Sequence, residues 1–347
     1  MQTSKKINTK GSIFHFNNYL SLSFIRKSCI TTSGTVSIFT SFFKEARDCC
    51  RLVLNHIKAS PVKTGAFFLN KKVRKRIAIQ GIKGSNHHQV AREYFGDEIE
   101  LVECLSFHSL VDQLLEGKAD KGVMAIENSI AGSIIPNYAL VYENNLHIIG
   151  EHYLNIHHHL MGLRGQTIAD IREVRSHPMA LLQCREYLKT QSHIKMVEDV
   201  DTAETAFRIR EEKLSGIAAI APEMAAEMYD LEIISPEIQT IKNNATRFII
   251  VKTVNKELPK EEINKASLRF ITDHKRGSLA TVLNVMSDCN LNLTKIQSLP
   301  IIETPWKYAF FVDVTFDDYN HFAKSKSLLQ IMSEDFKVLG EYKNTRI

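Results

Sequence analysis

The sequence has little of what builds disulfide frameworks, metal clusters or membrane spans. Its six cysteines form no CxxC pair and no disulfide pattern, so we expect inert thiols in a reducing compartment and a cytoplasmic protein. The sequence contains no run of 18 apolar residues that could span a bilayer, and no membrane partner is expected. The adjacent histidines His157, His158 and His159 lack a second ligand group at suitable spacing, which favours structural or surface histidines over a metal site.

Acidic residues are almost missing from residues 1–75, which carry 14 Lys and Arg against Glu45 and Asp48. The other 272 residues hold 30 basic and 37 acidic side chains, so the main body is mildly acidic, which argues against a nucleic-acid groove. The basic segment is rich in Ser, Lys and Phe and shows no sustained period. A disordered extension, or a stretch translated from an early start codon, is favoured there over a transit peptide.

From Arg76 onward, short apolar runs alternate with helical patterns. "RIAIQG", "LVECL" and "GVMAI" predict buried strands, and "SFHSLVDQLLEG" predicts an amphipathic helix between them. A second set contains "EVRSHPMALLQCREYL", "GIAAIAP" and the helix "DTAETAFRIREEKL", which Asp201 or Thr202 would cap. Strands that alternate with helices indicate parallel α/β sheets, and two α/β lobes around a cleft are the simplest arrangement.

The last 80 residues follow a different rhythm after the charged linker "NKELPKEEINKAS". Their predicted order, βαββαβ, is that of a ferredoxin-like domain. We therefore predict an N-terminal extension over residues 1–75, a two-lobed domain over 76–255 and a separate domain over 265–347.

Polar residues gather where the predicted strands end. Ligands of open α/β lobes bind beyond the carboxyl ends of strands, where helix N-termini offer free N–H groups. These residues provide hydroxyls, amides and one Arg, without a metal cluster, a P-loop or a paired nucleophile and base, which suits a small organic anion with two carboxylates. Each also has a structural alternative, such as a Gly turn, a helix cap or a surface ion pair. The residues are Gly81, Gly84, Ser85, Glu127, Asn128, Ser129, Gly132, Ser133, Ser176, His177, Asn244, Thr246 and Arg247.

The chain resembles the prephenate dehydratase family over about residues 76–347. The resemblance lies in "GKADKGVMAIENSIAGSI", "SHPMALLQC", "AAEMYDL" and "NATRF", and in "RGSLATVL" and "NLTKIQSLP" near the C-terminus. The Glu-Asn-Ser and Thr-Arg-Phe motifs in this order are the family's signature. The tail resembles an ACT domain, which in this family binds phenylalanine as a feedback inhibitor.

The resemblance implies a hydro-lyase without a cofactor, with two lobes of the type II periplasmic-binding-protein plan. It implies that Thr246 donates a hydrogen bond to the departing hydroxyl, that Arg247 clamps a substrate carboxylate, and that Glu127 or His177 is a general acid. The expected substrate-binding residues are Ser85, Asn128, Ser129, Gly132, Ser133, Ser176, His177, Asn244 and Phe248. The expected phenylalanine-binding residues are Gly277, Ser278, Leu279, Asn290, Asn292 and Ser298.

The chain also departs from the family pattern. The family usually has Pro where Ala125 stands, a Tyr-Ser-like pair where Asn86 and His87 stand, and Glu-Ser-Arg-Pro where this chain has "QSLP". Because Leu299 replaces that Arg, we expect weakened phenylalanine binding. Expected partners are prephenate, phenylalanine and further copies of the chain in a homodimer or homotetramer. An arogenate dehydratase and a non-catalytic anion-binding protein remain alternatives, whereas residues 1–75 lack the long helices of a fused chorismate mutase.

Overall fold

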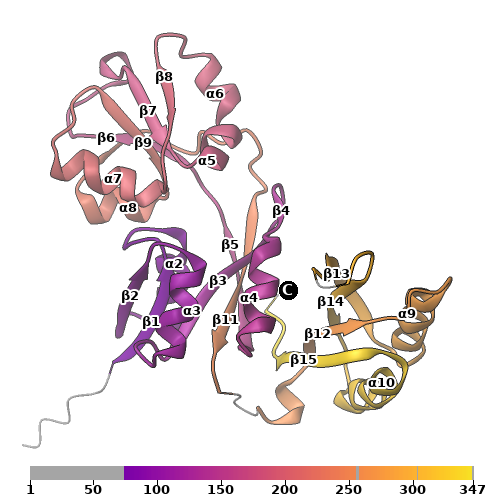
Figure 1. Ribbon diagram of the computed structural model, residues 1–347. Helices are drawn as coiled ribbons and strands as arrows, with labels where there is room; N and C mark the ends of the chain where they lie inside the picture. Colours follow the sequence, from indigo (N-terminus) through magenta and orange to yellow (C-terminus); the bar gives the residue numbers. More distant parts are fainter. Residues whose placement is uncertain (1–73, 255–257, 303, 346–347) are drawn as a thin grey trace, which may run out of the picture. The chain divides into compact units, whose positions relative to one another are not determined.

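The computed structural model describes residues 74–254, 258–302 and 304–345, and all of them belong to one unit by their contacts. The predictions for the N-terminal extension fall on residues outside this description, apart from its last two. Three sheets organise the described residues (Figure 1). We call them the first lobe, the second lobe and the C-terminal domain.

The first lobe is a mixed sheet with strand order β2-β1-β3-β11-β5, and the short β4 pairs with β3. The strands β1, β2 and β3 are parallel, as predicted, but β11 is antiparallel to both β3 and β5. The reason is the connection: β5 leads into the second lobe and β11 is the return strand (Figure 1). The elements are β1 (Lys75–Gln80), α2 (Asn86–Phe95), β2 (Ile99–Cys104), α3 (Phe107–Leu115), β3 (Lys121–Asn128), β4 (Gly132–Ser133), α4 (Ile135–Glu143), β5 (His147–Asn155) and β11 (Ala245–Lys252).

The second lobe has strand order β10-β6-β9-β7-β8. The Asp201 carboxylate accepts hydrogen bonds from the backbone N–H groups of Ala203 and Glu204, so Asp201 is the predicted cap of α7. The helix expected after Pro178 is divided at Cys184 into α5 and α6. The elements are β6 (His159–Gly162), η1 (Ile168–Asp170), β7 (Glu173–Ser176), α5 (Pro178–Gln183), α6 (Arg185–Lys189), β8 (Lys195–Glu198), α7 (Thr202–Glu211), β9 (Ile217–Ala221), α8 (Glu223–Tyr229) and β10 (Glu232–Ser235).

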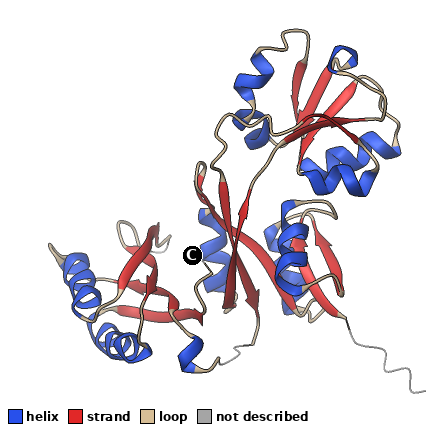
Figure 2. Cartoon of the chain, turned by 180° about the vertical axis from the view of Figure 1, so that it is seen from behind, coloured by secondary structure: helices blue, strands red, loops and turns tan. Residues whose placement is uncertain are grey.

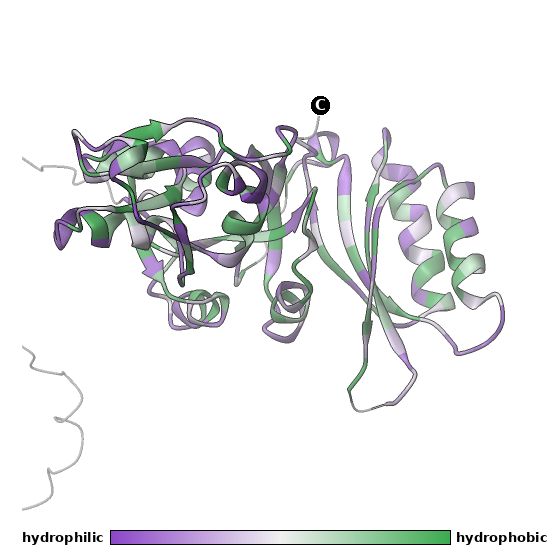
Figure 3. Ribbon diagram, turned by 90° about the horizontal axis from the view of Figure 1, so that it is seen from above, coloured by the Kyte–Doolittle hydropathy of each residue, from purple (hydrophilic) through white to green (hydrophobic). Residues whose placement is uncertain are grey.

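The C-terminal domain has the predicted βαββαβ order, with an antiparallel sheet in the order β13-β14-β12-β15. Both helices cover one face of this sheet (Figure 2). Green and purple segments alternate along them in Figure 3, as expected for helices with one buried side. The elements are η2 (Lys260–Glu262), β12 (Lys265–Ile271), α9 (Ser278–Asp288), β13 (Asn292–Pro300), β14 (Tyr308–Thr315), α10 (Tyr319–Met332) and β15 (Glu334–Tyr342). None of the helices described in the chain is long and apolar enough to cross a membrane.

The other face of the C-terminal sheet packs against the first lobe. One apolar cluster contains Ile148 and Ile249 from β5 and β11 together with Phe311 and Leu339 from the C-terminal domain. The contact is close enough to require a glycine, since a Cβ atom on Gly340 would lie 2.1 Å from the Ile148 carbonyl oxygen. The back of the strand pair β5 and β11 is therefore covered by the C-terminal domain.

Candidate active site

A cavity of about 610 Å³ is lined by residues of both lobes. Four helices begin at its wall, and their N-cap residues Ser85, Ser106, His177 and Asp201 all line it. At the starts of α2 and α3, free backbone N–H groups meet the positive end of the helix dipole, whereas α5 begins with Pro178 and the Met179 N–H already donates to His177. This part of the molecule is therefore suited to an anion.

No Lys or Arg is among the described residues that line the cavity. Its charged or titratable side chains are Asp201 and the histidines His87, His108, His158 and His177. Since Asp201 already receives two backbone N–H groups of α7, its charge is compensated by that helix. Carboxylates of a ligand would be bound here by N–H, hydroxyl and amide donors rather than by a cationic clamp.

A chain of hydrogen bonds crosses the wall of the cavity from one lobe to the other. The Asn128 amide donates to Asn244 Oδ1 at 2.7 Å and to Thr246 Oγ1 at 2.9 Å. Asn244 in turn donates to Gln183 Oε1 at 3.0 Å, and His158 Nε2 lies 2.8 Å from the same oxygen. Strands β3 and β11 of the first lobe are thereby tied to α5 of the second.

This chain of hydrogen bonds orients the Thr246 hydroxyl. Thr246 lies at the cavity wall and is 8% exposed, and its oxygen accepts the Asn128 amide hydrogen. Because that oxygen already serves as an acceptor, its own hydrogen is available to donate. The opposite side of Asn128 is also held, since its Oδ1 accepts the N–H groups of Ile130 and Ala131. The result is a preorganised neutral donor.

His87 is a buried, uncharged part of the same wall. Its ring meets Phe248 edge-on at a centroid distance of 5.0 Å and lies 5.6 Å from Phe107. Burial lowers the pKa of His87 to about 3, so the imidazole is neutral at physiological pH. Its Nε2 has no hydrogen-bond partner among the described residues.

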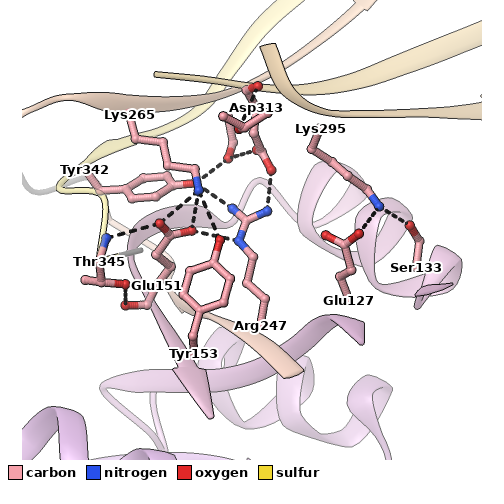
Figure 4. Close-up of polar contacts among 12 residues, drawn as sticks. Glu127, Ser133, Glu151, Tyr153, Arg247, Lys265, Lys295, Asp313, Tyr342 and Thr345 are labelled. Carbon is pink, nitrogen blue, oxygen red and sulfur yellow. Dashed lines mark hydrogen bonds and ion pairs between the residues drawn. The ribbon is translucent and has the colours of Figure 1, made fainter. Parts of the chain in front are cut away.

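Two expectations about catalytic residues are corrected by the side-chain directions. Arg247 and Glu127 do not line the cavity; both point to the C-terminal domain (Figure 4). Arg247 donates to Glu151 at 2.7 Å, to Tyr342 at 2.9 Å and to Asp313. The cause is strand geometry, because consecutive residues of a strand face opposite sides and Thr246 takes the cavity side. Neither residue is therefore placed to clamp or protonate a ligand in this cavity.

The remaining predicted site residues divide into two groups. Ser85, Asn128, His177, Thr246 and Phe248 line the cavity, and Asn244 contacts it through Asn128 and Gln183. Four others serve the framework: the Ser176 hydroxyl donates to the Ile220 carbonyl, Ser129 accepts from Ala245 N, Ser133 accepts from Lys295, and Gly132 is exposed in β4.

Sequence reasoning missed Gln183, His158 and Ser106 as parts of the cavity wall. A signal existed for two of them. Gln183 lies in "SHPMALLQC", seven residues after the strand-end Ser176. Ser106 is the first residue of the predicted helix "SFHSLVDQLLEG", and the structure makes it the N-cap of α3. His158 gave no such signal, because adjacent histidines on an extended segment differ only in the side they face.

The residues expected to bind phenylalanine lie at two turns of the C-terminal domain. Gly277 caps α9 with φ of +85°, a conformation that favours glycine, and Ser278 and Leu279 begin the helix. Asn290 has φ of +56° in the turn after this helix, and Asn292 begins β13. Ser298 lies further along β13. Whether these residues bind an amino acid stays a prediction.

Known proteins with similar sequences identify the family. The family model "Prephenate dehydratase" matches residues 77–256. A "Bifunctional chorismate mutase/prephenate dehydratase" of Enterobacter agglomerans is 32% identical, with 78% of this chain and 71% of the relative covered. The "Arogenate dehydratase/prephenate dehydratase 2, chloroplastic" of Arabidopsis thaliana is 33% identical, with 78% and 73% covered. The chain belongs to the prephenate dehydratase family.

Solved structures show the same fold. A prephenate dehydratase of Staphylococcus aureus superposes with a TM-score of 0.67 at 25% identity, covering 77% of this chain and 100% of the other. A protein titled "GqqA- a novel type of quorum quenching acylases" gives 0.71 at 28% identity, covering 78% and 98%. A prephenate dehydratase of Arthrobacter aurescens in complex with L-Phe gives 0.70 at 23%, covering 78% and 90%. The predicted fold class, two α/β lobes followed by a ferredoxin-like domain, is confirmed.

Proposed function

We propose that this chain converts prephenate to phenylpyruvate in the cavity between its two lobes. The observation that carries the proposal is the combination of four helix N-caps at the wall with a Thr246 hydroxyl oriented by Asn128. Membership of the prephenate dehydratase family supports this choice of substrate. No cofactor is required by the reaction.

The substrate's two carboxylates need different surroundings. The pyruvyl carboxylate keeps its charge, and the N–H groups at the starts of α2 and α3, after Ser85 and Ser106, are suited to bind it. The ring carboxylate leaves as neutral CO₂, which a poorly solvated position favours. The apolar part of the wall, with Phe107 and Phe248, is the expected place for the ring.

The chemical step breaks two bonds and makes the ring aromatic. The electron pair of the bond to the ring carboxylate moves into the ring as CO₂ leaves, and the bond to the hydroxyl on the opposite carbon breaks. The departing hydroxide becomes water with one proton. Thr246 would donate a hydrogen bond to this leaving oxygen and stabilise its developing charge. A threonine is too weak an acid to be the main proton source, and His177 at the wall is the remaining candidate of the two expected general acids.

Regulation by phenylalanine, in a homodimer or homotetramer, forms part of this proposal. The C-terminal domain has the βαββαβ order of the domain that binds phenylalanine in relatives, and the turn at Gly277 offers backbone N–H groups at the start of α9. Leu299, which occupies the usual Arg position, predicts weakened affinity. We propose a cytoplasmic location as well, although the Arabidopsis relative is named as chloroplastic.

The test is direct. Purified full-length chain is incubated with prephenate and without any added cofactor, and phenylpyruvate is followed by its absorbance in alkali. We expect turnover, with inhibition at millimolar phenylalanine. Unchanged prephenate after prolonged incubation would refute the activity and favour a non-catalytic binding protein. One of the structural neighbours is named as an acylase. If the chain hydrolysed an acylated amine and left prephenate unchanged, an acylase function would replace the proposed dehydratase function.

Arogenate is the second candidate substrate. It undergoes the same chemistry with an amino group in place of the side-chain keto group, and the Arabidopsis relative carries both activities in its name. Comparison of kcat/KM for the two substrates decides between them. A preference for arogenate would indicate that the wall accepts an ammonium group, for which Asp201 offers Oδ2, since its Oδ1 already accepts the α7 N–H groups.

A further inference from the structure

Strands β3 and β11 carry the cavity on one side and the C-terminal domain on the other. In their antiparallel register, Thr246 lies opposite Asn128 and Arg247 lies opposite Glu127. Since side chains alternate along a strand, the first pair faces the cavity and the second pair faces away from it. One oppositely charged pair thus lies directly behind the two polar residues of the proposed active site.

The C-terminal domain presents a matching pair. Lys295 of β13 lies opposite Asp313 of β14 in the register of that sheet. Lys295 donates to Glu127 and, at 2.6 Å, to the Ser133 hydroxyl, while Asp313 accepts from Arg247 (Figure 4). We call Glu127, Arg247, Lys295 and Asp313 the ionic square. Each of its two strand pairs has one positive and one negative charge, and each charge meets its opposite across the domains.

Burial makes this arrangement selective. The side chains of Arg247 and Asp313 are 5% and 7% exposed, and those of Lys295 and Glu127 are 16% and 31% exposed. A displacement that brought Arg247 to Lys295 would place like charges together and leave the buried Asp313 carboxylate without its cation, which is strongly unfavourable. The ionic square therefore defines one relative position of the two strand pairs.

The ladder between β3 and β11 is interrupted at the same place. Its register shifts between Arg247 and Phe248, because Ile126 is an extra, unpaired residue that forms a bulge in β3. A bulge removes regular ladder bonds and bends the strand locally. Side-chain contacts at Glu127 and Arg247 therefore have more influence on the direction of Asn128 and Thr246 than they would in a regular ladder.

We propose that Glu127 and Arg247 are positioning residues, through which Lys295 and Asp313 of the C-terminal domain hold Asn128 and Thr246 in their places at the cavity. This inference rests on the proposed function. It gives the C-terminal domain a part in turnover itself, in the absence of any bound amino acid. None of the four charges needs to touch the substrate.

A double-mutant cycle tests the ion pair between Lys295 and Glu127, the more exposed of the two ion pairs between the domains. Glu127→Gln and Lys295→Met, alone and together, are made in the full-length chain and assayed with prephenate. We expect each single variant to lower kcat by about 10-fold with KM within about threefold, because misplacement of a catalytic group affects the rate more than binding. The double variant should be no slower than the slower single variant, since both changes remove the same contact.

The control pair is Lys326→Met and Glu341→Gln. These residues form an ion pair at 3.0 Å within the C-terminal domain, with side chains 35% and 20% exposed. Lys326 belongs to α10 and Glu341 to β15, and their side-chain hydrogen bonds among the described residues lie within the C-terminal domain, so kcat should stay at the wild-type value. Rates that fall equally in the control and test variants would overturn the proposal, because general weakening of the domain would explain both.

Hydrogen–deuterium exchange gives a second readout that needs no substrate. In Glu127→Gln and Lys295→Met, backbone amides of residues 121–128 and 245–252 should exchange faster than in the wild type and in the control pair. If the wild type does not turn over prephenate, the proposed function fails while this exchange still tests the positioning. Single variants with wild-type kcat, multiplicative losses in the double variant, or a loss of kcat without faster exchange in these strands would each overturn the proposal.

Discussion

The two faces of the strand pair β3 and β11 differ in their polar side chains: one face has neutral groups and the other has paired charges. The cavity face has the neutral groups Asn128 and Thr246, joined by a 2.9 Å hydrogen bond and surrounded by helix N-termini. The opposite face has the charges Glu127 and Arg247, compensated by Lys295 and Asp313. The proposed anion site thus has no Lys or Arg among its described lining residues, although Arg247 is buried a single residue away.

The charged face is also larger than one pair. Glu151, which is fully buried, accepts from Arg247 and from Lys265 at 2.8 Å. Burial disfavours the charge on Arg247, but Asp313 and Glu151 favour it, and the pKa of Arg247 lies well above its ordinary value. With Asp313, these residues are two cations and two anions inside the protein. Their charges are satisfied by one another and leave none for a ligand.

The largest effect is expected from removing a charge from the face that carries Glu127 and Arg247. Arg247→Met should lower the free energy of unfolding by about 3–5 kcal/mol, because Glu151 and Asp313 lose a buried partner. Where the variant is folded, its KM should stay close to the wild-type value, since the guanidinium does not reach the cavity. Denaturant unfolding and steady-state kinetics measure the two quantities.

The matched control for this variant is Arg92→Met. Arg92 is 44% exposed and pairs with Asp97 at 2.7 Å, so its loss should cost about 0–1 kcal/mol. A large rise in KM for Arg247→Met at unchanged stability would restore the carboxylate clamp that the sequence suggested.

The next largest effect is expected from removing the Thr246 hydroxyl from the cavity face. Thr246→Val preserves the shape of the side chain and removes the donor, and should lower kcat by about 10²–10³ with little change in KM or stability. Thr246→Ser keeps a hydroxyl at the same position and should recover most of the rate. A valine variant within about twofold of the wild type would exclude Thr246 from the chemical step.

The sequence predicted which residues lie near this site better than it predicted the side of the strand that each side chain faces. Thr246 and Arg247 are adjacent, so strand alternation alone required that only one of them face the cavity. The choice between them depends on which side the C-terminal domain covers. That cover comes from Asp313 and Lys295, some 50–70 positions further along the chain. No local pattern in "NATRF" contains this information.

Sequence patterns correctly predicted the features that depend only on residues close together in the chain. The Asp201 cap, the Pro178 helix start and the βαββαβ order of the tail all depend on residues close together in the sequence, and each is observed. The antiparallel direction of β11 was not predicted, because it depends on a return from the second lobe. The same long connection placed Asn244 beside Gln183, which sequence reasoning did not bring together.

A third effect concerns His87 on the cavity face. Its folded-state pKa of about 3 lies below the unfolded value of about 6.5, so the unfolded chain binds a proton first as pH falls. The stability due to the neutral ring is present above pH 6.5 and is lost as pH falls toward 3. Between pH 7 and pH 5 this loss is about 2 kcal/mol.

His87→Phe isolates this contribution, since phenylalanine keeps a ring against Phe107 and Phe248 and does not titrate. The variant should lose about 2 kcal/mol less than the wild type between pH 7 and pH 5, as measured by denaturant unfolding at both pH values. Replacement of the exposed His193 by phenylalanine is the control for the same substitution at a position outside the cavity wall. Equal acid sensitivity of His87→Phe and wild type would show that the ring is accessible to protons in the folded state.

The smallest expected effect concerns Ser176, which the sequence placed among the substrate-binding residues. Its hydroxyl is fully buried and donates to the Ile220 carbonyl at 2.6 Å, inside the second lobe. Ser176→Ala removes this hydrogen bond and leaves the carbonyl without that donor, which should cost about 1 kcal/mol of unfolding free energy. Because the hydroxyl does not line the cavity, kcat and KM should stay within about twofold of the wild type. A tenfold fall in kcat at unchanged stability would instead show that Ser176 turns toward the substrate during turnover, and the division between framework and cavity residues would have to be redrawn at this strand end.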